Sequence, residues 1–507
     1  MQAAVAEASR ARAAGLPATG WRRRRGLSSS ITAFFICLGV TAVLLAVSPA
    51  FWHWFVIPVF LCGVVIVADA VDWVLGRVDL MDPVGIIGAI GTLHFFAAPF
   101  LHVYWDQWLA DVTYPPDWRP WLGWMALLNF VGLVGYRIAR GRTAAAAERR
   151  PKKVWQLDRG RFRVAMLVAT PVALSFAGLL YVRFGGISGY MGAYVEGRLT
   201  SFEGLGWMFM FADSIPILVL LAYAVFATRS PAARSWIAVF AVLATVFVLR
   251  LGFGGLRGSR SSLVWALIWA VGVVHLWVRP VPRKVVSVGM VFLFLVIYVM
   301  AFYKGVGGEA FRDVTGARER AVLERETRYS TQAVVLFDMA RSSVQAYLLY
   351  RLTGPDTDYE YALGRTYVGG LAVAVPRALW PDRPITKVQE GTNALYGRDS
   401  FSAGRVQAYF VYGLAGEAML NFGPVAAPLA LIALGLAVRF VRGRFSFLDP
   451  GDVRRLLFPF LSTLCLVIVL SDSDNVVSYV VQNGTVPFLV LFASARRVPR
   501  DALPAGG

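Results

Sequence analysis

Long runs of apolar residues recur along the chain, and short polar segments separate them. Each run holds roughly 20 residues, which as an α-helix is enough to cross a hydrocarbon layer of about 30 Å. The pattern predicts about twelve membrane-spanning helices, near residues 31–49, 52–71, 83–102, 121–138, 164–183, 207–227, 236–253, 261–278, 285–303, 423–441, 456–470 and 476–494. The sequence therefore predicts an all-α polytopic integral membrane protein.

Composition agrees with this interpretation. Of the 507 residues, 57% are hydrophobic and only 16% are charged, whereas a soluble domain carries about 25% charged residues. The net charge of +19 would suggest a nucleic-acid partner in a soluble protein. Here most basic residues lie in short segments between apolar runs, so we expect no nucleic acid. The three cysteines lie inside apolar runs, so we expect neither a disulfide framework nor a metal site.

Basic residues alternate from one loop to the next, which orients the helices. An arginine run at 22–25 precedes the first predicted helix, and ten basic residues lie from Arg137, at the end of the fourth helix, to Arg163, just before the fifth. Further basic segments follow at every second loop, and the positive-inside rule places such segments in the cytoplasm. We therefore expect residues 1–30 to be a cytoplasmic basic tail without a cleaved signal peptide, and residues 495–507 to be a second cytoplasmic tail.

The longest hydrophilic stretch falls on the opposite face. It divides the chain into helices one to nine (31–303), a large extracytoplasmic loop (304–422) and helices ten to twelve (423–494). A structured loop of this length is usually functional. Within it, residues 317–350 are expected to be helical, and residues 406–420 are expected to form a half-buried or re-entrant helix.

The large loop is rich in arginine for an outer segment. Between Lys304 and Arg405 it holds fourteen basic and twelve acidic residues. Guanidinium groups bind phosphate oxygens in pairs, so a phosphate-bearing lipid head group is a candidate ligand. Surface salt bridges with neighbouring acids are the alternative. The closely spaced basic residues are Arg365, Arg377, Arg383, Lys387, Arg398 and Arg405.

Two shorter outer segments suggest the same chemistry. Residues 252–262, GFGGLRGSRSS, place Arg257 and Arg260 at the start of the eighth predicted helix, where free N–H groups favour an anion. A tight glycine turn is the alternative there. Residues 183–206 carry Tyr190, Tyr194 and Arg198, which could stack on sugar rings and hold phosphate, or could belong to an ordinary interfacial loop.

Two carboxylates lie in apolar surroundings. Glu417 belongs to the apolar stretch 406–435, and Asp213 lies near the outer end of the sixth predicted helix. An ionisable group in a membrane segment is a functional candidate, because burying it is costly. Glu417 is expected to orient an arginine or to act as a base toward a sugar hydroxyl. A structural acid paired with arginine is the alternative.

Four stretches of the sequence resemble one known family. They are GGISGYMGAYVEGR in the loop at 183–206, GLRGSR before the eighth helix, GRTYVGGLAVAVPRALWPDRP at 364–384, and AGEAMLNFGPVAAPLALIALG at 415–435. In these stretches the chain is similar to the oligosaccharide repeat-unit polymerases of the Wzy type, which extend O-antigens. The segment PRALWPDRP carries most of the resemblance, although family members usually have lysine where this chain has Arg383.

The resemblance implies an activity and a fold. The fold would be GT-C-like, in the cytoplasmic (inner) membrane, with a metal-independent glycosyl transfer on its outer face and no cofactor. The donor would be an oligosaccharide on polyprenyl (undecaprenyl) pyrophosphate, and the acceptor would be a sugar hydroxyl of a second lipid-linked repeat unit. A chain-length regulator and a flippase would be its partners in building a surface polysaccharide.

The resemblance also suggests roles for particular residues. Arginines in a partly dry cleft would stabilise the charge that develops on the departing pyrophosphate. The expected catalytic residues are Arg260, Arg377 and Glu417. Substrate binding is expected from Arg198, Arg257, Arg383, Lys387 and Arg405, from Tyr409 and Trp380 by stacking on sugar, and from Asp213.

Three functions besides polymerisation stay open. An O-antigen ligase uses the same donor, but ligases typically carry a histidine in the outer loop. The four histidines of this chain lie in or beside predicted helices, which favours the polymerase. We expect His94 and His102 to be packing residues. The second function is a transporter of polysaccharide precursors, although the chain shows no internal repeat that would favour it. The third is a non-catalytic scaffold.

Overall fold

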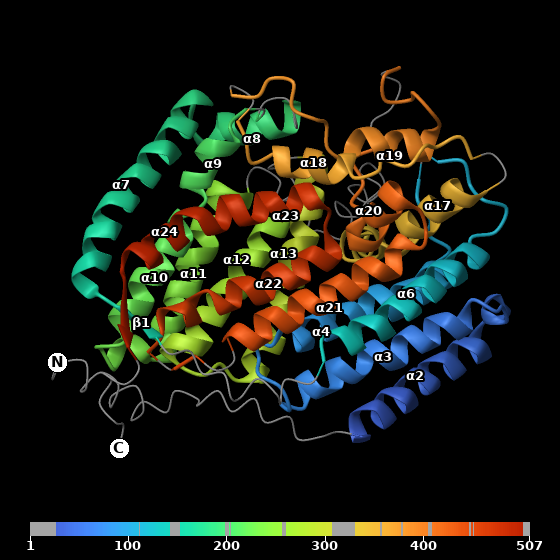
Figure 1. Ribbon diagram of the computed structural model, residues 1–507, viewed down its shortest axis with the longest axis horizontal. Helices are drawn as coiled ribbons and strands as arrows, with labels where there is room; N and C mark the ends of the chain where they lie inside the picture. The colour runs from blue at the N-terminus through green and yellow to red at the C-terminus, as the bar shows by residue number, and fades with distance from the viewer. Residues whose placement is uncertain are drawn as a thin grey trace.

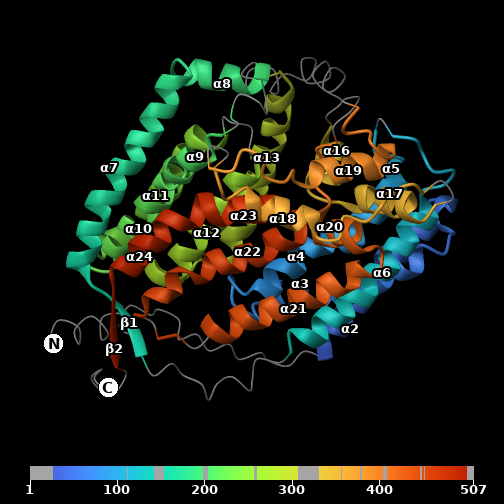
Figure 2. The ribbon, with the colours of Figure 1, turned by 45° about the horizontal axis from the view of Figure 1, so that its top comes forward.

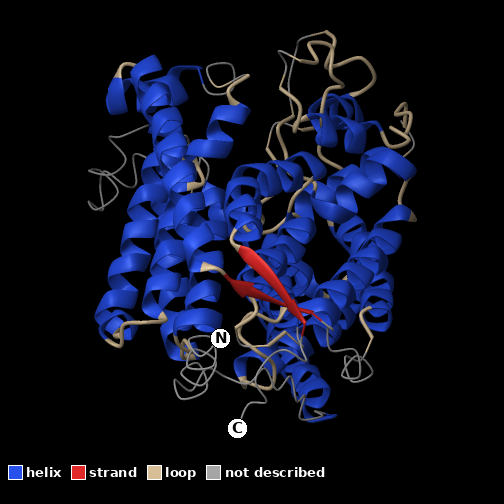
Figure 3. Cartoon of the chain, turned by 60° about the vertical axis from the view of Figure 1, so that its left-hand side comes forward, coloured by secondary structure: helices blue, strands red, loops and turns tan. Residues whose placement is uncertain are grey.

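The structure is a computed structural model. It describes residues 27–110, 112–141, 153–197, 202, 204–255, 260–306, 330–354, 357–376, 379–403, 408–445, 448–449 and 451–499. This part of the chain is almost entirely helical (Figure 3). Its two short strands, β1 (Lys153–Leu157) and β2 (Ala495–Pro499), pair antiparallel, and the sequence analysis did not predict them.

Eleven helical segments within these residues are long and apolar enough to cross a membrane. The remaining predicted span, the eighth (261–278), corresponds to a shorter apolar helix, Leu263–Val278. The architecture is therefore that of a polytopic membrane protein, as predicted. The long helices are α2 (Leu27–Val47), α3 (Val56–Val74), α4–α5 (Pro83–Trp105), α6 (Arg119–Ala139), α7 (Arg159–Arg183), α9–α10 (Gly206–Ala227), α11 (Trp236–Phe253), α13 (Arg283–Val306), α21 (Ala426–Phe445), the segment Val453–Leu470 with α22 (Phe458–Leu470), and α23–α24 (Ser473–Ala493).

The bundle has two distinct ends (Figure 2). At one end lie α17 (Ser342–Thr353), α18 (Arg365–Ala372), α19 (Lys387–Tyr396) and α20 (Gly413–Phe422), and we call this end the loop face. At the other end lie β1 and β2, and we call it the terminal face. Leu27, which begins α2, and Pro499, which ends β2, both lie toward this face (Figures 1 and 2).

Buried ion pairs fix helices to one another near the terminal face. Both terminal nitrogens of Arg140 at the end of α6 donate to the Asp69 carboxylate on α3, one of them over 2.7 Å. Arg442 on α21 donates to Asp82 at the start of α4 over 3.1 Å. Each pair satisfies charges that would be costly to bury alone.

The α6–α21 contact depends on small residues. Gly435 on α21 lies so close to α6 that a Cβ atom there would stand 2.7 Å from the Tyr136 carbonyl oxygen. Membrane helices commonly approach through small residues in this way, because close packing of the backbones replaces the hydrophobic effect as the source of association.

The large loop differs in part from the prediction. Of the expected helix 317–350, the stretch 317–329 lies outside the described residues. The remainder is split into α16 (Thr331–Ala333), a π-helical turn (Val334–Asp338) and α17, with a break at residues 339–341. The expected helix 406–420 begins only at Gly413. The segment 183–206, expected as a loop, contains the helix α8 (Gly186–Gly197).

The late start of α20 coincides with a left-handed residue. Gly413 adopts φ +69°, a left-handed conformation that favours glycine. The helix begins at this residue, and residues 408–412 before it are extended or irregular. The sequence analysis did not predict this turn.

We expect the Gly435→Leu variant to lose stability by about 1–3 kcal/mol, because the added side chain must push apart two backbones. Thermal unfolding of the detergent-purified protein measures this loss. Gly443→Leu on the same helix is the matched control, since a Cβ there meets no atom within 4 Å. Equal unfolding temperatures for the two variants would contradict the α6–α21 packing.

Candidate functional site

A cavity of about 2050 Å³ lies between α11, α12 (Arg260–Val273), α13 and the segments 330–344 and 466–483. Its wall reaches from Lys284 and Val285, at the start of α13 on the terminal face, to Asp106 and Tyr409 on the loop face. The cavity therefore extends along most of the height of the bundle.

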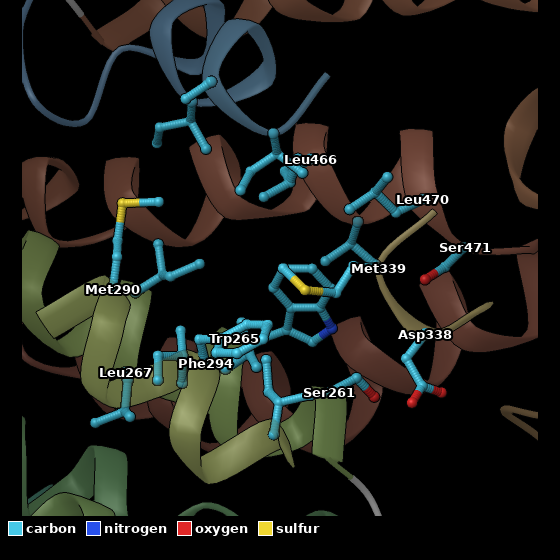
Figure 4. Close-up of a pocket in the computed structure, with 18 of the residues that line it drawn as sticks. Ser261, Trp265, Leu267, Met290, Phe294, Asp338, Met339, Leu466, Leu470 and Ser471 are labelled. Carbon is cyan, nitrogen blue, oxygen red and sulfur yellow. The ribbon is translucent and has the colours of Figure 1, made fainter. Parts of the chain in front are cut away.

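The middle of the cavity is apolar. Side chains of α11, α12 and α13 line it, and Figure 4 shows the rings of Trp265 and Phe294 beside Met290 and Leu267. The wall formed by α13 is packed loosely: among residues 283–300 only Met300 is fully buried. Arg283 fixes the beginning of α13 by donating to the carbonyl oxygens of Trp73 (2.8 Å) and Val78 (2.7 Å).

The loop-face end of the cavity is polar. Figure 4 shows the Asp338 carboxylate and the Ser471 hydroxyl at this end, with Ser261 nearby. Asp338 closes the π-helical turn Val334–Asp338, and Arg341 follows at the start of α17. A π-turn inserts an extra residue into a helix and is frequent at functional sites. Here the carboxylate of Asp338 and the guanidinium of Arg341, three residues apart, both lie on the cavity wall.

Arg250 forms the deeper polar part of the wall. Its side chain is almost completely buried. It donates to the Asn483 amide oxygen over 2.7 Å and to the Asp213 backbone carbonyl over 2.9 Å, and its guanidinium lies 3.7 Å from the Asp213 carboxylate. Asp213, expected to bind substrate, is thus buried as the ionic partner of Arg250.

Two buried carboxylates behind the cavity wall hold the beginnings of two helices. Asp472, just before α23, accepts N–H groups from Tyr412 (2.9 Å) and Gly413 (2.7 Å) at the start of α20. Glu417 within α20 accepts the N–H group of Ser473 (2.6 Å) at the start of α23. Each helix, with the residue just before it, therefore supplies the carboxyl oxygens that accept free N–H groups at the start of the other. We call this arrangement the reciprocal cap.

The reciprocal cap also gathers α18 and α19. Thr366 on α18 donates its hydroxyl to Glu417 over 2.8 Å. Lys387 on α19 donates to Asp472, and it donates to Asp474 over 3.1 Å. Lys387, expected to bind substrate, is therefore buried as the counter-ion of two carboxylates.

The charges of the reciprocal cap shift its proton equilibria. Burial raises the pKa of Glu417, and the neighbouring Asp472 raises it further. The hydrogen bonds from Ser473 and Thr366 lower this pKa but do not cancel the shift. Burial lowers the pKa of Lys387, but Asp472 and Asp474 outweigh this effect, so that the pKa is raised and the ammonium stays charged.

Several expected site residues lie outside the described residues, namely Arg198, Arg257, Arg377 and Arg405. Arg260 is the first residue of α12, although its side chain is not described; the next residue, Ser261, lines the cavity. Arg383 donates to carbonyl oxygens at the end of α18, among them that of Val375 over 2.8 Å.

The two expected aromatic residues are both exposed, but only Tyr409 lines the cavity. Glu417 does not line the cavity. It binds Ser473, and the residues on either side of this position, Ser471 and Asn475, do line the cavity. His102 is fully buried and stacks on Trp108 with ring centroids 5.6 Å apart. His94 is also buried, so both histidines pack as expected.

Sequence reasoning missed Asp338, Arg341 and Arg250 as cavity residues. Asp338 and Arg341 were counted among the charges of the large loop, where their spacing across a helix break gave no signal. Arg250 carried a signal that could have been used, because it is an arginine inside an apolar run. Among the described residues, no three histidine, cysteine or acidic side chains are grouped to hold a metal ion.

The fold and the cavity thus define a polytopic membrane protein with an apolar cavity that has a polar end. Comparison of the chain with protein-family models, curated proteins and solved structures finds no match.

The raised pKa of Glu417 predicts a pH-dependent stability. Because the folded protein holds this proton more tightly than the unfolded chain, the contribution of Glu417 to stability is greatest below the ordinary pKa of 4.5 and is lost as the pH rises through the folded-state value. The Glu417→Gln variant lacks this titration. Between about pH 5 and pH 8, the unfolding temperature of the wild type should fall by roughly 2–4 °C more than that of the variant. Parallel curves would contradict the prediction.

Proposed function

We propose that this protein polymerises oligosaccharide repeat units linked to polyprenyl pyrophosphate, on the outer face of the cytoplasmic membrane. The loop face would be extracytoplasmic, and both termini would be cytoplasmic. The proposal joins the resemblance of the four sequence stretches to one structural observation, the cavity with an apolar middle and a polar loop-face end.

The cavity supports a ligand with a long apolar chain and a polar head. Its middle is lined by side chains such as Leu243, Leu267 and Ile268, which suit an isoprenoid chain and offer no hydrogen bonds. Its polar end carries Asp338, Arg341 and Ser471, which suit a pyrophosphate and sugars. A polyprenyl pyrophosphate glycan divides in the same way between a lipid tail and a polar head.

Arginines would stabilise the leaving group in the proposed reaction. The bond between the donor sugar's C1 and the pyrophosphate oxygen breaks, and the pyrophosphate remains on the lipid with the added negative charge. Preorganised guanidinium groups at the place where this charge develops lower the barrier, each by about 2–4 kcal/mol. Arg341 lies on the cavity wall. Arg260 is the first residue of α12, and the second, Ser261, also lines the cavity. Arg377 is the third candidate, on the sequence resemblance alone.

Asp338 is our candidate for the base. The acceptor hydroxyl oxygen forms the new bond to C1, and its proton must pass to an acceptor. Asp338 lies on the wall of the polar end (Figure 4), whereas Glu417 lies behind it. In this proposal Glu417 is a positioning residue, because it holds the segment that presents Ser471 and Asn475 to the cavity.

A transporter fits the same cavity less well. The apolar middle is lined mainly by aliphatic and aromatic side chains, so it favours holding a lipid tail over passing a polar head. A ligase shares the donor and differs in its acceptor, and the products formed in cells distinguish it from a polymerase.

The function is tested by complementation. A strain deleted for the gene receives the wild type, Arg260→Ala, Arg341→Ala or Arg377→Ala at equal membrane abundance, and its lipid-linked and exported glycans are separated by length. We expect deletion to leave single repeat units, the wild type to restore a ladder, and each variant to reduce polymer formation about 10²–10³-fold.

Arg398→Ala is the matched control, because this arginine is exposed on the loop face, pairs with Glu360 over 3.0 Å and does not line the cavity. It should restore the full ladder. Long chains that remain on the polyprenyl lipid in the deleted strain would indicate a ligase. Unchanged glycans would reject both functions.

The assignment of Asp338 has its own test. Asp338→Asn keeps the shape of the side chain but cannot accept the proton, so the rate of chain extension with purified lipid-linked repeat units should fall about 10²–10⁴-fold. Asp382→Asn, an exposed position away from the cavity wall, serves as the control. An Asp338→Asn rate equal to that of the control would remove Asp338 from the reaction.

A further inference from the structure

An apolar surface lies on the loop face next to the beginning of α21. Leu363 and Leu371 of the α18 region are 73% and 64% exposed, and Val425 before α21 is 70% exposed. Val368 and Phe422 are also exposed. We call Leu363, Val368, Leu371, Phe422 and Val425 the outer patch.

The outer patch has a fixed orientation, because the opposite side of α18 is packed tightly. Thr366, Gly369 and Gly370 are buried on that side. A Cβ atom at Gly370 would stand 2.9 Å from the Asp474 backbone nitrogen at the start of α23. α18 therefore rests with its backbone against α23, and Val368 and Leu371 point away from the protein.

The turn before α18 holds Leu363 outward. Leu363 has φ +45°, a conformation that is costly for a residue other than glycine. The turn is held by the end of α20: Leu363 donates its N–H group to the Asn421 carbonyl oxygen over 3.0 Å, and Gly364 donates to the Asn421 side chain over 2.8 Å. A strained, well-anchored turn thus exposes a large apolar side chain.

The outer patch continues the lipid-facing side of α21. The ring of Tyr367 on α18 stacks on Phe422, with centroids 6.4 Å apart. Val425 then begins an exposed stripe at helical spacing, Val425, Leu429, Leu436 and Phe440. The other side of α21 packs against α6, so this stripe faces lipid. The patch lies at the loop-face end of the stripe.

We propose that α18 is an interfacial helix whose outer patch is inserted among the acyl chains of the leaflet on the loop face. A short amphipathic helix lies in this way with its apolar side in the membrane boundary and its polar side in the protein or in water. Arg365, at the start of α18, is largely exposed and pairs with Glu390 over 2.8 Å, so its charge stays at the polar margin. The inference rests on exposure and packing, and it holds whether or not the protein is a polymerase.

Fluorescence depth measurements test this placement. Val368→Cys and Leu371→Cys are labelled with an environment-sensitive dye in the full chain, which is reconstituted into vesicles of phosphatidylethanolamine and phosphatidylglycerol. The native cysteines are buried, and mock-labelled wild type gives their background. Glu360→Cys, exposed on the loop face, is the aqueous control, and Leu436→Cys is the control for the membrane interior and for correct insertion.

We expect the dye at 368 and 371 to emit at shorter wavelength than at 360. Lipids with a nitroxide near the head group should quench it at least two-fold more than lipids with a nitroxide at mid-chain, and the order should reverse at 436. Emission and iodide quenching equal to those at 360 would overturn the proposal in favour of a solvated face. A blue shift without nitroxide quenching would overturn it in favour of a protein contact.

Discussion

The loop face is held to the spanning helices by hydrogen bonds at the beginnings of two helices, α20 and α23. The N–H groups of each helix start bind a carboxyl group on or next to the other helix. The N–H groups at the start of α20 and α23 are buried, and each would cost about 1–3 kcal/mol without a partner. Asp472 and Glu417 supply these partners reciprocally. Because Thr366 and Lys387 bind the same two carboxylates, the positions of α18 and α19 also depend on them. These two helix beginnings thus fix α18, α19 and α20 to one another and to α23.

Charge within the bundle is separated from the apolar middle of the cavity. Asp69 with Arg140 and Asp82 with Arg442 lie near the terminal face, and Arg250 with Asp213 lies nearer the loop face. Pairing offsets the cost of burial at these ends. Between the two ends of the bundle, α11, α12 and α13 present apolar side chains to the cavity. A ligand with a polar head and an apolar tail would therefore meet a polar end and an apolar middle that are already formed.

The sequence predicted the spanning helices well, because runs of apolar residues directly reflect the thickness of a membrane. It predicted the outer loop less well, since contacts distant in sequence decide its structure. The start of α20 at Gly413 depends on Asp472, 59 residues away. Glu417 was identified because an acid in an apolar run is conspicuous, but its hydrogen bonds to Thr366 and Ser473 were not foreseeable from spacing. Asp338 and Arg341 reach the cavity through a π-turn that leaves no pattern in the sequence. For Arg377 and Arg405, which lie outside the described residues, the expectation stays a prediction.

The loose packing of α13 has a mechanical consequence. The helix is anchored at its first residue, where Arg283 binds two backbone carbonyls, and along most of its length it is not buried by the rest of the protein. A helix held in this way can adjust its tilt to the thickness of the surrounding bilayer. Tilting about the Arg283 anchor would move one whole wall of the cavity. The width of the cavity would then follow the thickness of the membrane, and lipid composition would affect what the cavity can admit.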